Sequence, residues 1–405
     1  MNKLPNGWQE KKLKDISDIT SSKRIYEFEY VSIGIPFYRG KEITALKNKQ
    51  KIENFIYISE ARYNELKENY GVPKKDDILI TAVGTIGNAY TIENDKPFYF
   101  KDGNLLWLKN IKEYPKFLEY LFENSKKIFI DNSFGSSQHA LTISKLANLT
   151  FNFPPLEEQK RIASALSKVD AYLENTIKLT ESKERFKRAI TKKLLTCKEN
   201  KNVPEARFEG FEDEWETVKL GDITRMSSGG TPNTKIKEYY NGDITWVTIS
   251  DITNSYKYLY DTEKNITKLG LQNSSAKIFS INTILYAIYG SIGECAISKV
   301  ECATSQAILG IECSDRINYN FLYYLLFNYK NDAKKLKQQG TQPNLNKQIV
   351  LNFHFKIPSI KEQEKIGEFL SLLDTEIDNL KKQAEGIKRL KKGLMKKLMS
   401  GEIRI

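Results

Sequence analysis

A long, helix-forming segment occurs twice in this chain of 405 residues. The stretch FPPLEEQKRIASALSKVD begins at Phe153, and the related stretch KIPSIKEQEKIGEFLSLLD begins at Lys356. Each continues into about forty residues whose apolar side chains alternate by three and four, which is the pattern of a coiled-coil seam. Because a single amphipathic helix is marginally stable in water, each segment needs a partner.

The apolar stripes identify the residues that we expect at the contact between the two helices. The first stripe turns polar in its middle and then resumes, while the second has one gap near Lys391. The predicted seam comprises Ile162, Leu166, Val169, Leu173, Ile190 and Leu194 in the first helix, and Ile366, Leu370, Leu373, Ile377, Leu380, Ile387, Leu394 and Leu398 in the second.

The distribution of charge predicts that the two helices run antiparallel. Lysine and arginine dominate the second half of each segment, over residues 183–201 and 381–400, whereas acids dominate residues 361–380. Antiparallel packing places the basic half of the first helix on the acidic half of the second and also opposes the helix dipoles. At 1.5 Å per residue, about 38 residues make a rod roughly 55–60 Å long. Since B-DNA repeats every ~34 Å, such a rod suits a reader of two half-sites separated by a fixed gap.

The repeat extends into the residues that precede each helix. WQEKKLKDI at Trp8 matches WETVKLGDI at Trp215, and ILITAVGTIG at Ile78 matches ILYAIYGSIG at Ile284. The offset between the copies falls from 207 residues at the first match to 204 in the helices, so small insertions or deletions lie within the globular parts. Short β-rich runs broken by Gly, Asn and Asp, followed by helical runs, predict mixed α/β domains. The chain is therefore predicted to be a duplicated module with a pseudo-two-fold axis.

Composition limits the classes of function. A net charge of +12 favours nucleic acid or another anionic partner. The apolar runs are too short for a membrane span and the first residues lack a signal-peptide core, so we expect a cytoplasmic protein. Four cysteines without CxxC spacing and only two histidines leave little for a metal site or a catalytic triad.

Four features together resemble the specificity subunit of a Type I DNA restriction-modification enzyme. The first is the doubled P-x-x-x-E-Q entry into the long helices, at Pro154 and Pro358. The second is VPEARFEGFEDEWETVKLGDI from Val203, which is similar to the link between halves in that family. The third is SGGTPNTKIKEYYNGDITWVTISDI from Ser228, and the last is the ending LMKKLMSGEIRI. The resemblance covers essentially the whole chain.

The resemblance implies a fold and a division of labour. It implies a mixed α/β (α+β) fold with one target recognition domain at residues 1–153, a linker and a second target recognition domain at 201–357, and two conserved spacer helices at 154–200 and 358–405. Each domain would read one half of a bipartite double-stranded DNA sequence. Two modification subunits would bring S-adenosylmethionine for methylation, and restriction subunits would bring ATP and Mg for translocation and cleavage. This chain would be a non-catalytic DNA-binding subunit of the restriction system, without a cofactor of its own.

The sequence supports the absence of catalytic chemistry but leaves other readings open. GIPFYRGKE, from Gly34, departs from the phosphate-loop pattern, and FPPL, from Phe153, lacks the acid or amide of an amino-methyltransferase motif. One alternative is a coiled-coil adaptor whose two domains bind proteins. Another is the specificity part of a fused methyltransferase-nuclease, which would need a cofactor motif.

Candidate DNA contacts come from polar loops in equivalent places of the two halves. GSSQHALT and GTQPNLN each follow a helix and precede a last strand, and Gln or Asn suits adenine in the major groove. The alternative for these two loops is that they are polar turns that cap strands. The arginine and lysine in YRGKE could instead be solvated charges. VGTIG and YGSIG could instead be tight structural turns. The candidates are Arg39, Lys41, Thr85, Ser136, Ser137, Gln138, His139, Thr231, Asn233, Ser291, Thr341, Gln342 and Asn344.

Overall fold

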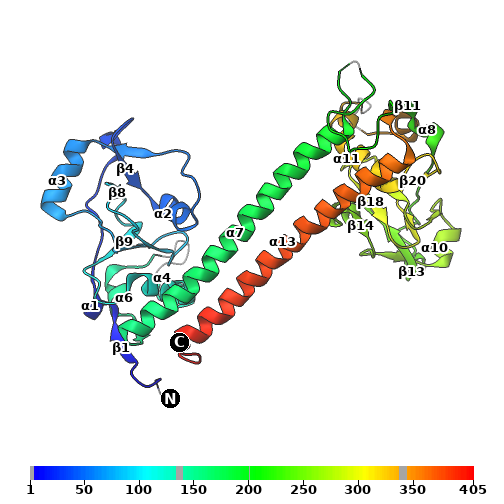
Figure 1. Ribbon diagram of the computed structural model, residues 1–405. Helices are drawn as coiled ribbons and strands as arrows, with labels where there is room; N and C mark the ends of the chain where they lie inside the picture. The colour runs from blue at the N-terminus through cyan, green and yellow to red at the C-terminus, as the bar shows by residue number, and fades with distance from the viewer. Residues whose placement is uncertain (1–3, 134–139, 200, 337–343) are drawn as a thin grey trace. The chain divides into compact units, whose positions relative to one another are not determined.

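The computed structural model describes residues 4–133, 140–199, 201–336 and 344–405. The chain divides into two compact units, one of Met1–Ile177 with Lys382–Ile405 and the other of Lys178–Lys381. Each unit contains one globular domain and one end of each long helix (Figure 1). Within the described residues, no helix has the length and apolar character needed to cross a membrane.

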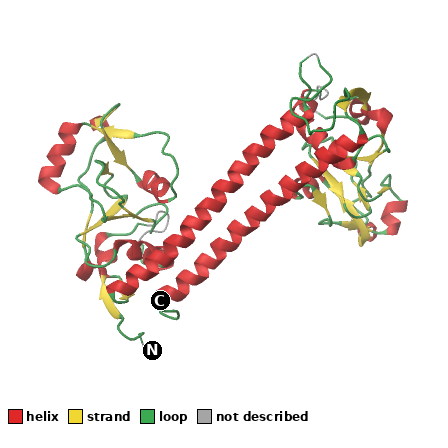
Figure 2. Ribbon diagram, in the orientation of Figure 1, coloured by secondary structure: helices red, strands yellow, loops and turns green. Residues whose placement is uncertain are grey.

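The two long segments form the helices α7 (Leu156–Leu195) and α13 (Ile360–Ser400), of 40 and 41 residues. Both are drawn as unbroken ribbons in Figure 2. Prolines at positions 154, 155 and 358 lie just ahead of them, where a missing backbone N–H costs no helical hydrogen bond. Gly401 ends α13 with a φ of 72°, a left-handed conformation that favours glycine.

Contacts within each unit show that α7 and α13 are antiparallel. In the first unit, Leu166 near the start of α7 shares a core with Leu398 near the end of α13. In the second unit, Leu194 near the end of α7 shares a core with Leu370 near the start of α13. Lys183 pairs with Glu376 at 2.7 Å, so the basic half of α7 meets the acidic half of α13. The antiparallel prediction is confirmed.

The polar middle of the first stripe is part of the buried surface of α7. Thr176 and Thr180 continue the three-and-four spacing after Leu173 and are 5% and 8% exposed. The hydroxyl of Thr176 donates to the carbonyl of Tyr172 at 2.9 Å, so its burial leaves no unpaired donor. In the sequence a threonine interrupts an apolar stripe, whereas in the structure a threonine whose hydroxyl bonds to its own helix can continue it.

The N-terminal domain contains two sheets, in the orders β2-β9-β6-β7 and β3-β5-β4-β8, and the pair β1-β10. Its strands are β1 (Gln9–Lys12), β2 (Asp18–Thr20), β3 (Tyr30–Val31), β4 (Ile35–Tyr38), β5 (Ile56–Ile58), β6 (Ile78–Thr81), β7 (Ala89–Thr91), β8 (Tyr99–Phe100), β9 (Leu105–Lys109) and β10 (Thr150–Phe153). Its helices are α1 (Leu13–Ile16), η1 (Glu27–Glu29), α2 (Gly40–Lys47), α3 (Glu60–Tyr70), α4 (Pro115–Asn124), α5 (Lys126–Asp131) and α6 (Ile143–Asn148).

The second domain contains sheets in the orders β12-β20-β17-β18-β14 and β15-β13-β19-β16, and the pair β11-β21. Its strands are β11 (Glu216–Lys219), β12 (Thr224–Ser228), β13 (Tyr240–Val247), β14 (Tyr258–Leu259), β15 (Asn265–Ile266), β16 (Ile278–Phe279), β17 (Ile284–Ala287), β18 (Cys295–Ser298), β19 (Cys302–Thr304), β20 (Ile308–Cys313) and β21 (His354–Ile357). Its helices are α8 (Leu220–Ile223), η2 (Lys237–Tyr239), α9 (Ile249–Asn254), α10 (Lys268–Gln272), α11 (Tyr319–Lys335) and α12 (Lys347–Leu351).

The two domains repeat one plan. The order β2-β9-β6-β7 corresponds to β12-β20-β17-β18, and β14 extends only the second of these sheets in the described residues. In each domain the first strand pairs antiparallel with the strand that leads into the long helix. Buried strands such as β6 and β17 form the centre of each core. The structure therefore confirms the predicted mixed α/β fold and internal repeat.

Candidate nucleic-acid interface

In the N-terminal domain, the sheet topology gathers several loops at one edge. Strands β2 and β6 both run antiparallel to β9, so the carboxyl ends of β2 and β6 lie beside the amino end of β9. The loops at this edge are residues 21–25, 82–88 and 101–104. The segment that leads into α6 joins them, because Ala140 pairs with Val83. We call this set of loops the loop edge.

The second domain has the same loop edge. Strands β12 and β17 both run antiparallel to β20, which collects the loops 229–236, 288–294 and 305–307. The amide of Leu345 donates to the carbonyl of Ile288 at 3.0 Å, so the segment before α12 joins this edge as well. Loops held by a rigid sheet are a common location for binding residues. Among the described candidates, Thr85 lies at the loop edge of the first domain and Thr231, Asn233 and Ser291 lie at that of the second, whereas Arg39 and Lys41 follow β4 of the other sheet.

Arg39, a candidate for binding phosphate or guanine, already has an acidic partner. It lies at the end of β4, and its Nε and Nη2 donate to the carboxylate of Glu42 at 3.2 and 2.8 Å. Glu42 is 3% exposed, so this carboxylate needs the arginine as its counter-charge. Lys41 is 65% exposed and lies 3.6 Å from the same carboxylate. A DNA role for either side chain stays a prediction.

The turns that carry Thr85 and Ser291 have glycines in the left-handed region. Gly84 and Gly87 have φ values of 76° and 80°, and Gly290 and Gly293 have values of 60° and 83°. In the first turn the hydroxyl of Thr81 donates to the carbonyl of Thr85. These observations support the structural interpretation of both turns, and Thr85 and Ser291 remain candidates for contacts with the sugar-phosphate backbone.

The remaining candidates differ in how the structure holds them. The hydroxyl of Thr231 donates a hydrogen bond to Oε1 of Gln306. Asn233 accepts the amide of Lys235 at 3.1 Å through Oδ1, which caps a turn. Asn344 is half-buried. The candidates that lie outside the described residues are Ser136, Ser137, Gln138, His139, Thr341 and Gln342.

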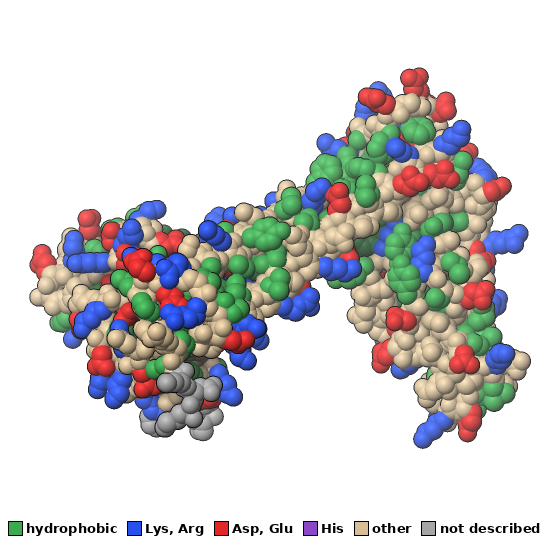
Figure 3. Space-filling view, turned by 60° about the horizontal axis from the view of Figure 1, so that its bottom comes forward, with side chains coloured by type: hydrophobic (Ala, Val, Ile, Leu, Met, Phe, Trp, Pro, Cys, Tyr) green, Lys and Arg blue, Asp and Glu red, His purple; other side chains and the backbone are tan. Residues whose placement is uncertain are grey.

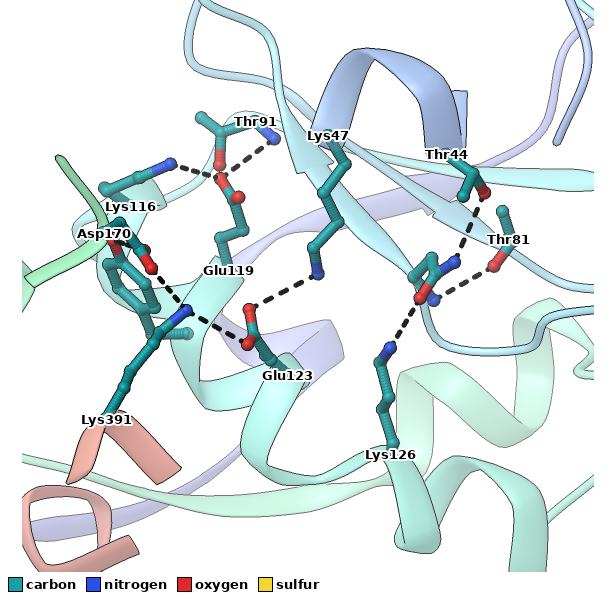
Figure 4. A network of polar contacts seen from close by, with 12 residues as sticks. Thr44, Lys47, Thr81, Thr91, Lys116, Glu119, Glu123, Lys126, Asp170 and Lys391 are labelled. Carbon is teal, nitrogen blue, oxygen red and sulfur yellow. Dashed lines mark hydrogen bonds and ion pairs between the residues drawn. The ribbon is translucent and has the colours of Figure 1, made fainter. Parts of the chain in front are cut away.

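A buried tyrosine joins each domain to its long helices. In the first unit, Tyr120 on α4 donates to Asp170 on α7 at 2.7 Å, and Lys391 on α13 pairs with the same carboxylate at 2.7 Å. Glu123, one turn beyond Tyr120, accepts Lys391 at 3.2 Å and lies 3.6 Å from Lys47. Figure 4 shows the ammonium of Lys391 between the two carboxylates. This network holds the domain and both helices in one packing arrangement.

The second unit repeats the same contact 204 residues later. Tyr324 on α11 donates to Asp374 on α13 at 2.5 Å, and Lys187 on α7 pairs with that carboxylate. The roles of the two helices are exchanged relative to the first unit, as expected for a repeated module whose long helices run antiparallel. The structure thus preserves a structural contact residue by residue through the duplication.

The second unit adds a buried lysine to this contact. Lys257 precedes β14 and is 5% exposed, and its Nζ lies 4.3 Å from the ring centre of Tyr324 and 4.9 Å from that of Tyr258. It donates to the hydroxyl of Ser371 on α13 at 2.5 Å. Burial lowers the pKa of Lys257 to about 7, although the carboxylate of Asp374 acts in the opposite direction.

This lysine makes the stability of the second unit depend on pH. In the unfolded chain Lys257 keeps its ordinary pKa near 10.5, so between pH 7 and 10.5 the unfolded state binds more protons. The free energy of unfolding then rises with pH, on the order of 1 kcal/mol per pH unit. Burial also raises the pKa of Tyr324, which therefore stays protonated in this range. We expect a Lys257→Met variant to lose this increment when denaturant unfolding is compared at pH 7 and pH 9; equal pH dependence in both proteins would contradict it.

Comparison with known proteins identifies the architecture. A family model described as Type I restriction modification DNA specificity domain matches the chain twice, over residues 5–181 and 212–389. The chain belongs to this family. Within residues that the structure describes, no group of His, Cys, Asp and Glu side chains could hold a metal ion.

Curated relatives carry the same family name. The Type I restriction enzyme MjaIX specificity subunit of Methanocaldococcus jannaschii is 37% identical over 188 residues, which is 45% of this chain and 43% of that protein. The putative MjaX specificity subunit of the same organism is 24% identical over 418 residues, covering all of this chain and 96% of that protein. The first match spans less than half of the relative, and the second runs from end to end.

Solved structures of specificity subunits share the fold. The S subunit of a Type I restriction-modification system from M. genitalium matches with a TM-score of 0.60 and 18% identity, covering 98% of this chain and 97% of that chain. The HsdS subunit from Thermoanaerobacter tengcongensis matches with a TM-score of 0.51 and 17% identity, over 99% and 98% of the two chains. Figure 1 shows the same elements in this specificity-family chain: domains rich in short strands, and the long helices α7 and α13.

The structure explains the repeated Glu-Gln pair of this specificity-family protein. Gln363 is 1% exposed and accepts the amide of Asn318 at 2.9 Å, while its Nε2 donates to the carbonyls of Arg316 and Pro358 at 3.1 and 2.9 Å. Gln159 is held in a similar way in the first unit, where its Oε1 accepts the amide of Tyr114 and its Nε2 donates to the carbonyl of Pro154 and to the carboxylate of Glu113. Each glutamine fastens the start of a long helix to the segment that enters α4 or α11.

Several residues at the loop edges of this chain were not predicted from the sequence. Arg24 and Asp102 form an ion pair in the first domain, and Gln306 accepts a hydrogen bond from the hydroxyl of Thr231 in the second. One signal for them was present in the sequence, because the offset of 207 in the first match aligns Arg24 with Thr231. The other partners could not be found that way, since they meet only when the strands pair.

Proposed function

We propose that this chain is the DNA-recognition subunit of a Type I restriction-modification enzyme and that each unit reads one half of a bipartite sequence. The family model that matches both halves carries this proposal. The two loop edges share a plan but differ in their residues, which suits two different half-sites. Because α7 and α13 are continuous over about forty residues, we propose that their length sets the gap between the half-sites.

Partner subunits are part of the proposal. We assign methyl transfer with S-adenosylmethionine to modification subunits, and ATP- and Mg-dependent translocation and cleavage to restriction subunits. Figure 3 supports the proposal that this chain and its partners bind the DNA phosphates together, since basic and acidic side chains are interspersed on the face it shows. A reader that neutralised many phosphates alone would need a stronger basic surface. The partners would supply the rest of the phosphate contacts.

The long helices offer a surface for these partners. Hydrophobic side chains lie along their exposed faces in Figure 3. Exposed apolar side chains of this kind are a surface that helices of another subunit could cover. Those that are at least 37% exposed include Tyr172, Ile177, Leu179 and Phe186 on α7, and Leu372 and Leu390 on α13.

The test is to express the chain with its cognate modification subunit and to map methylated bases across a genome. We expect one two-part motif with a fixed, unspecified gap. Expression of either protein alone should give no such motif. A co-purifying complex without sequence-dependent methylation or DNA retention would instead support an adaptor that binds proteins through its two domains.

A further inference from the structure

One exposed contact occupies equivalent places in the two loop edges. Thr20 in β2 and Ser227 in β12 pair with matched positions of β9 and β20, and the residues four further along the chain are Arg24 and Thr231. The partners of these residues lie two positions after β8 and β19, at Asp102 and Gln306. Both contacts therefore join the loop after the first sheet strand to the loop before the last one.

The two contacts differ in chemistry. The Nε of Arg24 donates to Oδ2 of Asp102 at 2.8 Å, and the arginine side chain is 64% exposed. In the second domain, the hydroxyl of Thr231 donates to Oε1 of Gln306, whose side chain is also exposed. One domain presents a guanidinium held by a carboxylate, and the other presents a carboxamide held by a hydroxyl.

Contacts with a structural role do not differ in this way between the two units. The tyrosine–aspartate–lysine contact and the glutamine at the start of each long helix keep the same residue types in both units. At the loop edges the position of the contact is kept while its chemistry has changed. An exposed ion pair adds at most about 1 kcal/mol to stability, so stability gives little reason for it.

We propose that these two contacts are base-reading elements, in which Arg24 aligned by Asp102 reads a guanine in one half-site and Gln306 aligned by Thr231 reads an adenine in the other. The inference rests on the proposed function and assigns the chemistry of its two reading sites.

The donors and acceptors of each side chain beyond these two contacts match these bases. With Nε held by Asp102, both Nη groups of Arg24 can donate to O6 and N7 of guanine, the pairing that arginine makes in the major groove. In Gln306, Thr231 occupies one lone pair of Oε1. The second lone pair can accept the N6 amine of adenine while Nε2 donates to N7. The supporting residue removes the rotational freedom that a lone surface side chain would lose on binding.

The experiment compares methylation motifs of the complex with its cognate modification subunit. We expect Arg24→Ala to relax one guanine position in one half-site, with discrimination there falling roughly tenfold to a hundredfold. Arg24→Lys should relax it as well, because an ammonium lacks the bidentate fork. Gln306→Ala should relax one adenine position in the other half-site. Gln306→Glu keeps an acceptor for Thr231 and should shift that position toward cytosine.

Each half-site is the internal control for the variant in the other half. Arg316→Ala is the matched control variant, because Arg316 is an exposed arginine bonded to Glu216 beyond the far end of β20. It should leave the motif unchanged. A wild-type motif that is not bipartite would remove the proposed function itself. A bipartite motif that Arg24→Ala and Gln306→Ala leave intact, or a uniform loss of methylation without relaxation at one position, would overturn the inference alone.

Discussion

A Gln363→Leu variant should lose roughly 3 kcal/mol of unfolding free energy in the second unit. Leucine has nearly the volume of glutamine but cannot hydrogen-bond, so two carbonyls and one amide lose their buried partner. A buried backbone group left unpaired costs about 1–3 kcal/mol. The start of α13 should then separate from the turn that enters α11, which is observable as faster hydrogen exchange of the Asn318 amide.

Two further variants make this result specific to the hydrogen bonds. Gln363→Glu keeps the acceptor for Asn318 but loses both donors, so it should be destabilised as well. Gln348→Leu places the same substitution at an exposed position of α12 and should change the unfolding free energy little. Similar unfolding midpoints and equal exchange rates for Gln363→Leu and Gln348→Leu would show that the hydrogen bonds of Gln363 have no structural role.

The antiparallel helix pair could be predicted from sequence because it follows from periodicity and charge, which are local properties. Ile366 and Leu370 stand in an apolar stripe that continues to Ile387, and the acids near Asp374 face lysines on α7. The buried Thr176 and Thr180 were missed because their burial depends on a hydrogen bond to the helix backbone. Lys257 was missed for a similar reason, since three tyrosine rings surround it only in the folded unit.

The loop edges could be predicted only in part. Repeated loops such as VGTIG and YGSIG are visible by comparison of the halves, whereas Arg24 and Asp102 lie 78 residues apart in sequence. They meet because β2 pairs with β9, and no periodicity specifies that pairing. Arg39 shows the same limit for a local contact, because its bond to the buried Glu42 three residues later is not evident from the sequence. Partner choice for charged loop residues is a property of the tertiary structure.

Removal of Arg207 should be the most destabilising change at a charged residue in the second unit. Arg207, in the segment that follows α7, donates to both oxygens of Glu362 at 2.9 and 2.8 Å, and the side chain of Glu362 is 1% exposed. An Arg207→Leu variant leaves this carboxylate buried without its counter-charge, which costs about 3 kcal/mol or more. The position of Glu362 in the first turn of α13 offsets only part of this, since a helix amino terminus contributes about 1 kcal/mol.

A double variant separates the buried charge from the loss of packing. Arg207→Leu with Glu362→Leu removes both charges, so much of the stability should return, because an apolar pair can replace a buried ion pair at little net cost.

The first unit supplies the comparison: Arg404, after α13, pairs with Glu158 at 2.7 Å but is 43% exposed, and this guanidinium lowers the pKa of Glu158. Water can take its place there, so Arg404→Leu should cost less than Arg207→Leu in denaturant unfolding. If the double variant is no more stable than Arg207→Leu alone, the arginine acts through packing rather than through the charge of Glu362.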